Sequence, residues 1–218
     1  MDKKKKNMKQ ERVMAYIDGF NLYFGLKSKD WRRYYWLDLQ KMVQNLLKSN
    51  QVLDYTKYFT ARISGPPDKQ KRQTTYIEAL ETLPNFQTFY GKYQNIPRTC
   101  RRCDYREVVP IEKMTDVNIA VELLSDAFRD LYDAAYLISA DSDLVPVIAS
   151  MRSLFPQKRV IVAFPPGRYS RDLANKARFS LIIGRRTIAK SLFPPEIMKT
   201  DGFILKCPEL WKAHEESA

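Results

Sequence analysis

Aspartate residues stand directly after two apolar segments of this 218-residue chain, and another opens a helical pattern. Asp18 follows the first apolar run, Asp141 and Asp143 follow a second one, and Asp116 stands at the start of the helical pattern. If these carboxylates converge, each pair about 4 Å apart repels by about 4 kcal/mol at an effective dielectric of about 20. Such a group needs a cation, a shared proton or basic partners.

Carboxylate oxygens without nearby histidine or cysteine select hard divalent cations, which here means Mg²⁺ or Mn²⁺. A magnesium ion held by one or two carboxylates keeps several waters and accepts phosphate oxygens, which suits phosphodiester chemistry. Each aspartate alone also has a structural interpretation, because aspartate is common in turns and at helix N-caps. Asp143, for example, could cap the helix that follows it. The single histidine, His214, is near the end of the chain, which disfavours a histidine-dependent ribonuclease.

Strands and helices alternate along the chain, and the order of these elements determines where the aspartates lie in the fold. Continuous apolar runs predict buried strands at residues 13–17, 134–139 and 159–164. Aromatic and β-branched patterns predict further strands at residues 55–63, 86–93, 181–183 and 203–205. Apolar stripes predict helices at residues 37–47, 66–83, 115–131, 144–154, 171–178 and 188–192, with Thr115 as an N-cap. This order predicts an α/β fold whose parallel sheet is covered on both faces and binds ligands beyond the carboxyl ends of its strands.

An insertion at about residues 95–110 interrupts the alternation and predicts a loop or a β-finger. It holds two prolines, four arginines that suit contact with an RNA backbone, and the pair Cys100-x-x-Cys103. That cysteine spacing suits Zn²⁺, but a closed site needs four ligands. A Cys₃His site with Cys207 and His214, a site completed across a homodimer, and a reduced pair without metal all remain open.

The net charge of +12, from 37 Lys+Arg against 25 Asp+Glu, favours an anionic partner, with nucleic acid before a membrane surface. A solvated basic surface is the alternative. The three cysteines do not make a disulfide framework, so a cytoplasmic location is expected. No apolar run approaches the roughly 18 residues of a membrane span, and the N-terminus does not resemble a secretory signal. Only seven glycines argue against a glycine-rich phosphate loop.

Several basic and aromatic residues are candidates for RNA contact. The basic ones either follow the third buried strand or flank Asp116: Lys113, Arg168, Arg171, Lys176 and Arg178. A solvated surface or, for Lys113, an ion pair with Glu112 is the alternative; Glu112 itself suits an outer-sphere role at a metal. The aromatic residues Trp31, Tyr34, Tyr35 and Trp36 suit base stacking, the hydrophobic core or contacts in a homodimer.

Three segments resemble the NYN-domain family. They are Ile17-Asp18-Gly19-Phe20-Asn21, Glu112-Lys113-x-Thr115-Asp116-Val117-Asn118-Ile119-Ala120 and Ile138-Ser139-Ala140-Asp141-Ser142-Asp143-Leu144-x-Pro146. They look like its LabA-like branch, which belongs to the PIN-like metal-dependent nucleases, and the resemblance spans roughly residues 13–195. It implies a three-layer α/β/α fold with a central, mainly parallel sheet. One departure is Ala140, where the family usually has glycine.

The resemblance further implies a ribonuclease in which Mg²⁺ or Mn²⁺ activates water for hydrolysis of RNA. Carried over by position, Asp18, Asp116, Asp141 and Asp143 would be the metal-binding carboxylates, and Asn21 a polar helper beside the first. A non-catalytic RNA-binding adaptor and a structure-specific DNase remain alternatives. The expected organisation is a basic tail at residues 1–12, the nuclease domain with its finger at 13–195, and a C-terminal extension at 196–218.

Overall fold

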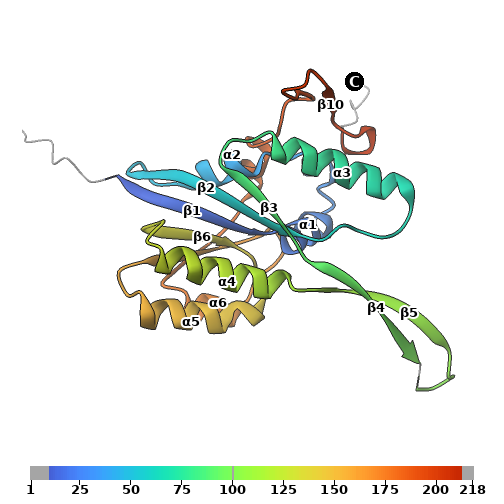
Figure 1. Cartoon of the computed structure of the whole chain (residues 1–218), viewed down its shortest axis with the longest axis horizontal. Helices are drawn as coiled ribbons and strands as arrows, with labels where there is room; N and C mark the ends of the chain where they lie inside the picture. The colour runs from blue at the N-terminus through green and yellow to red at the C-terminus, as the bar shows by residue number, and fades with distance from the viewer. Residues whose placement is uncertain (1–9, 100, 213–218) are drawn as a thin grey trace, which may run out of the picture.

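The computed structural model describes residues 10–99 and 101–212, with a six-stranded parallel sheet at its centre (Figure 1). Cys100, His214 and most of the basic tail lie outside the described residues. The spatial order of the sheet is β3-β2-β1-β6-β7-β8. The strands are β1 (Glu11–Asp18), β2 (Gln51–Thr60), β3 (Phe86–Tyr90), β6 (Ala134–Ile138), β7 (Arg159–Phe164) and β8 (Phe179–Ile182).

Helices cover both faces of this sheet, which confirms the predicted α/β/α class. One face carries α1 (Gly19–Ser28), α2 (Leu39–Gln44), α3 (Pro67–Glu81) and the short α7 (Arg185–Ala189). The other face carries α4 (Thr115–Phe128), α5 (Val145–Leu154) and α6 (Arg171–Lys176). The remaining short elements are η1 (Arg32–Tyr34), η2 (Ser142–Leu144), η3 (Glu209–Trp211), β9 (Glu196–Met198) and β10 (Ile204–Lys206).

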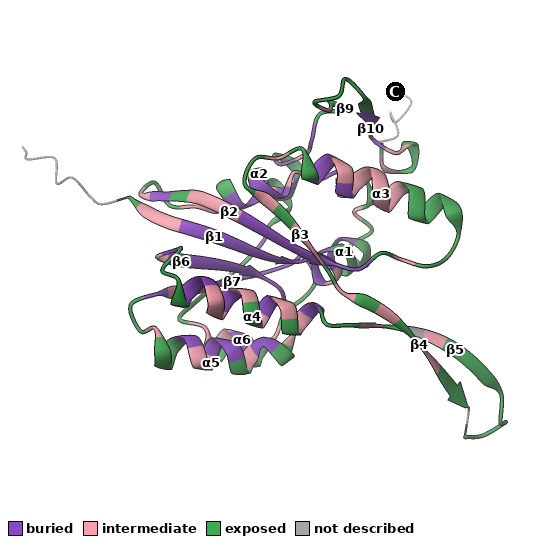
Figure 2. Cartoon of the chain, viewed as in Figure 1, coloured by how far each residue is buried: buried purple, intermediate pink, exposed green. Residues whose placement is uncertain are grey.

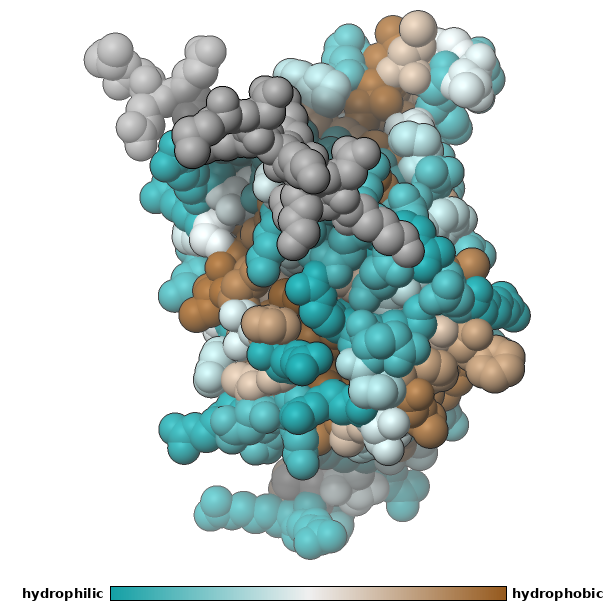
Figure 3. All heavy atoms as spheres, turned by 90° about the vertical axis from the view of Figure 1, so that its left-hand side faces the viewer, coloured by the Kyte–Doolittle hydropathy of each residue, from teal (hydrophilic) through white to brown (hydrophobic). Residues whose placement is uncertain are grey.

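The central strands are apolar on both sides because each side faces a helical layer. Along β1, Val13, Ala15 and Ile17 enter one core cluster, while Met14 and Tyr16 enter the other. Figure 2 shows this buried interior as purple strands between partly exposed helices. Figure 3 views the end of the molecule where the sheet begins, and hydrophilic residues predominate on that surface. None of the helices described here is long and apolar enough to cross a membrane.

The chain order of the strands reverses between β1 and β6. From β1 the chain moves to β2 and β3 on one side, and it later returns to β6 on the other side of β1. Beyond the carboxyl ends of such a strand pair, the connecting segments diverge and leave a crevice, where open α/β sheets bind ligands. Asp18 ends β1 and Asp141 closely follows β6, so the topology brings these two segments to that point.

The predicted finger is an antiparallel hairpin of β4 (Lys92–Thr99) and β5 (Arg106–Lys113). It leaves the body at the same end at which β1 and β6 finish, and it reaches outward with mostly exposed residues (Figures 1 and 2). Its second strand leads through Met114 directly into α4. The root of the hairpin is therefore part of the region that holds Asp116.

Helix α4 is tied to the sheet by a buried polar cluster. Tyr16 donates a hydrogen bond of 2.7 Å to Asp126, and Lys57 lies 2.5 Å from Asp126 and 2.6 Å from Glu122. Removing one partner from such a cluster would leave an uncompensated buried charge. The cluster therefore fixes the position of α4 against β1 and β2, and with it the position of Asp116.

The sequence patterns miss α1, which is important because it carries Asn21. Its sequence contains two glycines and three aromatic residues, which have modest or poor helix propensity. The aromatic segment that follows was a candidate for base stacking. Tyr34 and Trp36 are instead buried in the core, and Trp31 and Tyr35 pack partly buried against it.

Candidate active site

Asp18 is buried, with 2% of its surface exposed, and three donors hold its carboxylate. Its Oδ1 accepts a hydrogen bond from the Asn21 backbone N–H at 2.9 Å, which caps helix α1. Its Oδ2 accepts from Asn21 Nδ2 at 2.7 Å and from Ser139 Oγ at 2.8 Å. Burial raises the pKa of Asp18, and these hydrogen bonds oppose the rise. Asp18 therefore caps helix α1, which is the structural role expected of an aspartate after a strand, and it also lies in the crevice.

The same hydrogen bonds join the ends of β1 and β6. Ser139 Oγ accepts from the Asp141 N–H at 3.0 Å, and Asn21 Oδ1 accepts from the Ala140 N–H at 3.3 Å. Asn21 and Ser139 therefore contact both strand ends at once. Ser139 belongs to the third segment that resembles the family, and its bond to Asp18 depends on strand pairing that no local pattern reveals.

Asp141 and Asp143 differ from the geometry that their spacing predicts. In an extended segment, residues two apart face the same way, so this spacing would place both carboxylates on one side. The structure instead begins the short helix η2 at Ser142, and Asp141 Oδ1 caps it by accepting from the Asp143 N–H at 3.0 Å. Asp143 is exposed, whereas Asp141 is half-buried. It is therefore Asp141, and not Asp143, that caps this turn.

Asp116 lies in the first turn of α4, and Glu112 sets where that helix begins. Met114 adopts a left-handed conformation (φ 84°) between β5 and α4. The Glu112 carboxylate then accepts a hydrogen bond from the Thr115 N–H at 3.1 Å and another from the Thr115 hydroxyl. The prediction that Thr115 itself is the N-cap is wrong, because Glu112 takes over the capping of this helix end.

The ionisation of Asp116 reports on the carboxylates around it. Burial, followed by the negative charges of Asp141, Asp18, Glu112 and Asp143, raises the pKa of Asp116 to about 7. The charges of the other three predicted aspartates thus act on Asp116 at this end of the sheet. Among residues 10–99 and 101–212, no ion pair joins Asp116 to a basic side chain, so its charge is open to compensation by a cation.

The donor set suits Mg²⁺ or Mn²⁺, although no tight cage is formed. Within residues 10–99 and 101–212, no three acidic, histidine or cysteine side chains converge closely enough to hold one ion together. Magnesium commonly takes one or two carboxylates directly and fills its remaining positions with water and phosphate oxygens. A group of uncompensated carboxylates spaced around a crevice fits that mode of binding.

The basic residues that were predicted to contact phosphate lie in different parts of the structure. Arg168 reaches the site, because its Nη1 donates a hydrogen bond of 3.4 Å to Asn21 Oδ1. Lys113, at the end of β5, and Arg171, at the start of α6, are exposed. Arg178 precedes β8 and lies beside Lys158, at the opposite end of the sheet from the aspartates.

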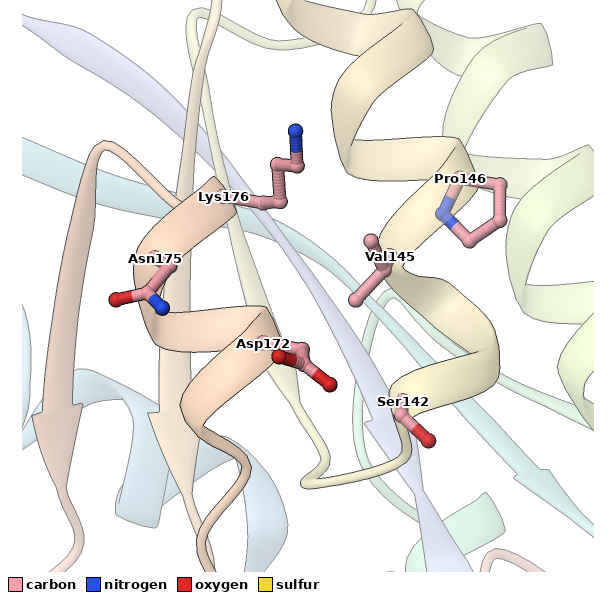
Figure 4. A pocket seen from close by; sticks show the side chains of 6 residues that line it. All are labelled: Ser142, Val145, Pro146, Asp172, Asn175 and Lys176. Carbon is pink, nitrogen blue, oxygen red and sulfur yellow. The ribbon is translucent and has the colours of Figure 1, made fainter.

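Lys176 lines an open hollow of about 430 Å³ between the η2–α5 segment and α6 (Figure 4). Asp172 on α6 and Ser142 on η2 lie on opposite sides of it. Because Ser142 stands between Asp141 and Asp143, this hollow adjoins the carboxylates. Its complete lining is Ser142, Val145, Pro146, Asp172, Asn175 and Lys176.

The zinc interpretation of the cysteine pair stays a prediction. Cys100 and His214 lie outside the described residues, and Cys103 is exposed in the turn of the β4–β5 hairpin. Cys207 directly follows β10 and is buried in a core cluster, and β10 lies away from the β4–β5 hairpin (Figure 1). Burial raises the pKa of the Cys207 thiol to about 11, which disfavours the thiolate that zinc requires.

Comparisons with known proteins agree with the fold. The chain is 27% identical over 179 residues to 6-hydroxy-3-succinoylpyridine 3-monooxygenase HspA of Pseudomonas putida (strain DSM 28022 / S16); this match covers 65% of the chain and 56% of that relative. The crystal structure of VPA0982, a protein of unknown function from Vibrio parahaemolyticus RIMD 2210633, is similar with a TM-score of 0.57 at 17% identity, covering 86% of this chain and 99% of that one. The family model for the NYN domain matches residues 12–183. The chain therefore belongs to the NYN-domain family.

Proposed function

We propose that this protein is a ribonuclease that hydrolyses RNA phosphodiester bonds with the help of Mg²⁺ or Mn²⁺. One observation supports the proposal: burial and the negative charges of Asp141, Asp18, Glu112 and Asp143 raise the pKa of Asp116 to about 7, so these carboxylates act on Asp116 at the ends of β1 and β6. A surface built only to bind RNA gains nothing from negative charge at this position. The membership of the chain in the NYN-domain family supports the same function.

The proposed roles of the four aspartates differ because their side chains differ in burial and hydrogen bonding. Asp18 is fixed by Asn21 and Ser139 and can present only a limited part of its carboxylate to a ligand. Asp141 and Asp116 are half-buried and less constrained, so they are the stronger candidates for direct contact with a cation. Exposed Asp143 is suited to accepting a proton from an attacking water, directly or through a second water.

A bound Mg²⁺ or Mn²⁺ would supply an activated water and would offset the charge that develops on the phosphate. The chain adds Arg168 beside Asn21 as a cation for the phosphate group. The excess of positive charge over the whole chain would attract the polyanion to a crevice that is itself acidic.

The first test compares cleavage by the wild-type protein and by Asp141→Asn. The asparagine keeps the oxygen that caps η2, so the variant should fold normally and yet lose at least about 100-fold in metal-dependent cleavage. Asp54→Asn, on β2 and away from the strand ends, is the matched control and should cleave as the wild type does. Equal cleavage by Asp141→Asn, or cleavage that persists in excess EDTA, would refute the proposal.

The same assay distinguishes the alternatives. Matched RNA and DNA strands of one sequence separate a ribonuclease from a DNase. RNA binding without cleavage in either metal would identify a non-catalytic adaptor. The distant relative is named a monooxygenase, and no observation on the described residues favours that activity for this chain.

A further inference from the structure

Helix α1 presents aromatic side chains to solvent beside the aspartates. The rings of Phe20 and Phe24 lie 6.5 Å apart and nearly parallel, and those of Tyr23 and Phe24 lie 5.3 Å apart. Tyr23 and Phe24 are each 43% exposed. Phe20 also meets the ring of Tyr93 edge-on at 6.0 Å, which connects the helix to the root of the β4–β5 hairpin. We name Phe20, Tyr23 and Phe24 the α1 aromatic surface.

Two cations flank this surface, and one of them connects it to the candidate active site. Lys27 Nζ lies 5.9 Å from the centre of the Phe24 ring, and the Arg168 guanidinium lies 5.8 Å from it. Arg168 also approaches Asn21, whose side-chain amide donates to Asp18. An unbroken series of contacts therefore leads from an exposed ring to a buried carboxylate.

The backbone holds Arg168 in this place by close packing. The loop after β7 presses on α1 so tightly that a side chain at Gly25 would meet the Pro166 carbonyl oxygen at 2.7 Å. Gly167 turns the loop with a φ of 69°, a conformation that favours glycine. The cation and the rings are thus placed in a fixed arrangement before any ligand arrives.

Exposed rings beside cations match the chemistry of an unpaired nucleotide. A base can stack on an aromatic face, and its phosphate can bind lysine or arginine; in a duplex both faces of the base are already covered. We propose that the α1 aromatic surface stacks unpaired bases next to the cleaved phosphate, with Lys27 and Arg168 on the neighbouring phosphates. This inference rests on the proposed function and narrows its substrate to RNA that is single-stranded at that point.

Binding of labelled RNA, measured by fluorescence anisotropy in EDTA so that the RNA stays intact, tests this inference. The probes are an unpaired 12-nucleotide RNA and a blunt duplex of the same length. We expect Tyr23→Ala/Phe24→Ala to bind the single strand at least about ten-fold more weakly, and to bind the duplex within about two-fold of the wild type. Phe24→Trp keeps a stacking face and should retain single-strand affinity.

Phe128→Ala is the matched control, because Phe128 is 82% exposed at the far end of α4. It should leave the binding of both probes unchanged. Unchanged single-strand binding by the double variant, or an equal loss for strand and duplex, would overturn the inference. So would a loss of self-association in the double variant, seen by sedimentation, because the surface would then join two copies of the chain. Binding without cleavage would refute the nuclease and leave the stacking inference intact.

Discussion

At the scale of single residues, the candidate site combines two roles that are often treated as alternatives. Asp18 caps α1 and Asp141 caps η2, yet both also raise the pKa of Asp116 through their charge. An N-cap uses only some of the lone pairs of a carboxylate, so the remaining ones stay open to a cation. The caps fix the orientation of these carboxylates, and the site gains rigidity from them.

The raised pKa of Asp116 predicts how stability without metal depends on pH. An ordinary aspartate ionises near pH 3.8, and in the folded protein Asp116 does so at about 7. The charge of Asp116 therefore lowers the free energy of unfolding. This loss is absent below about pH 4, grows as the pH rises to about 7 and is complete above that value. In EDTA at pH 8, Asp116→Asn should stabilise the protein by about 1–2 kcal/mol, after allowance for partial exposure.

Thermal unfolding of both proteins between pH 4.5 and pH 8.5 measures this effect. The gain of the variant should shrink towards zero at the acidic end, and Mg²⁺ should raise the melting temperature of the wild type more than that of Asp116→Asn. Glu107→Gln, on the exposed hairpin, should show no such trend. A gain that is constant across the range would contradict the assignment of the charge effect to Asp116.

At the scale of elements, the junction of β3, the hairpin and α4 sets the position of Asp116. Gly91 links β3 to β4 and packs against Glu112 and Thr115, which form the cap at the start of α4. A side chain at this glycine would overlap the Glu112 carboxylate and would meet the Lys113 carbonyl oxygen at 2.7 Å and Thr115 Oγ1 at 2.9 Å. The start of α4 can therefore take its observed place only against glycine.

Gly91→Ala should consequently displace the Glu112 cap. We expect a loss of about 1–3 kcal/mol in the free energy of unfolding and a larger proportional loss of RNA cleavage, because Asp116 moves with the cap. Urea unfolding and cleavage rates measure the two effects. Gly184→Ala is the control, since a side chain there would meet nothing within 4 Å, and it should change neither quantity. Equal effects of both substitutions would show that the close contact at Gly91 is unimportant.

These elements also show which parts of the fold can be predicted from the sequence. The buried strands at residues 134–138 and 159–164 were predictable, because continuous apolar runs report burial on both faces. The carboxyl ends of the strands predicted at residues 13–17 and 134–139 located Asp18 and Asp141. The sequence did not predict helix α1 because its glycines and aromatic residues have low helix propensity. These residues instead make close contacts with Pro166 and line the crevice. The turn at η2 and the Glu112 cap were not predicted either. Both are local hydrogen bonds between residues two and three apart, but Asp143 and Thr115 are equally good capping residues at the same places.

At the scale of the whole molecule, charge is divided between an acidic crevice and basic surroundings. The chain carries a net charge of +12, while the carboxylates gather at one end of the sheet. The β4–β5 hairpin reaches out from that same end, and between residues 92 and 113 it has six basic against three acidic residues. An RNA strand that enters the crevice would therefore pass a positively charged arm.

This arrangement predicts which cations determine the salt dependence of RNA binding. Arg98→Ala/Arg106→Ala, on the two strands of the hairpin, should weaken single-strand binding at low salt and lower the slope of log K against log[salt] by about 1.4, since each phosphate contact contributes about 0.7. Anisotropy titrations in EDTA at several salt concentrations give that slope. Arg129→Ala/Arg178→Ala removes the same charge from the opposite end of the sheet and should leave the slope nearly unchanged. If both pairs lower it equally, net charge alone attracts the RNA and the hairpin has no special part in binding it.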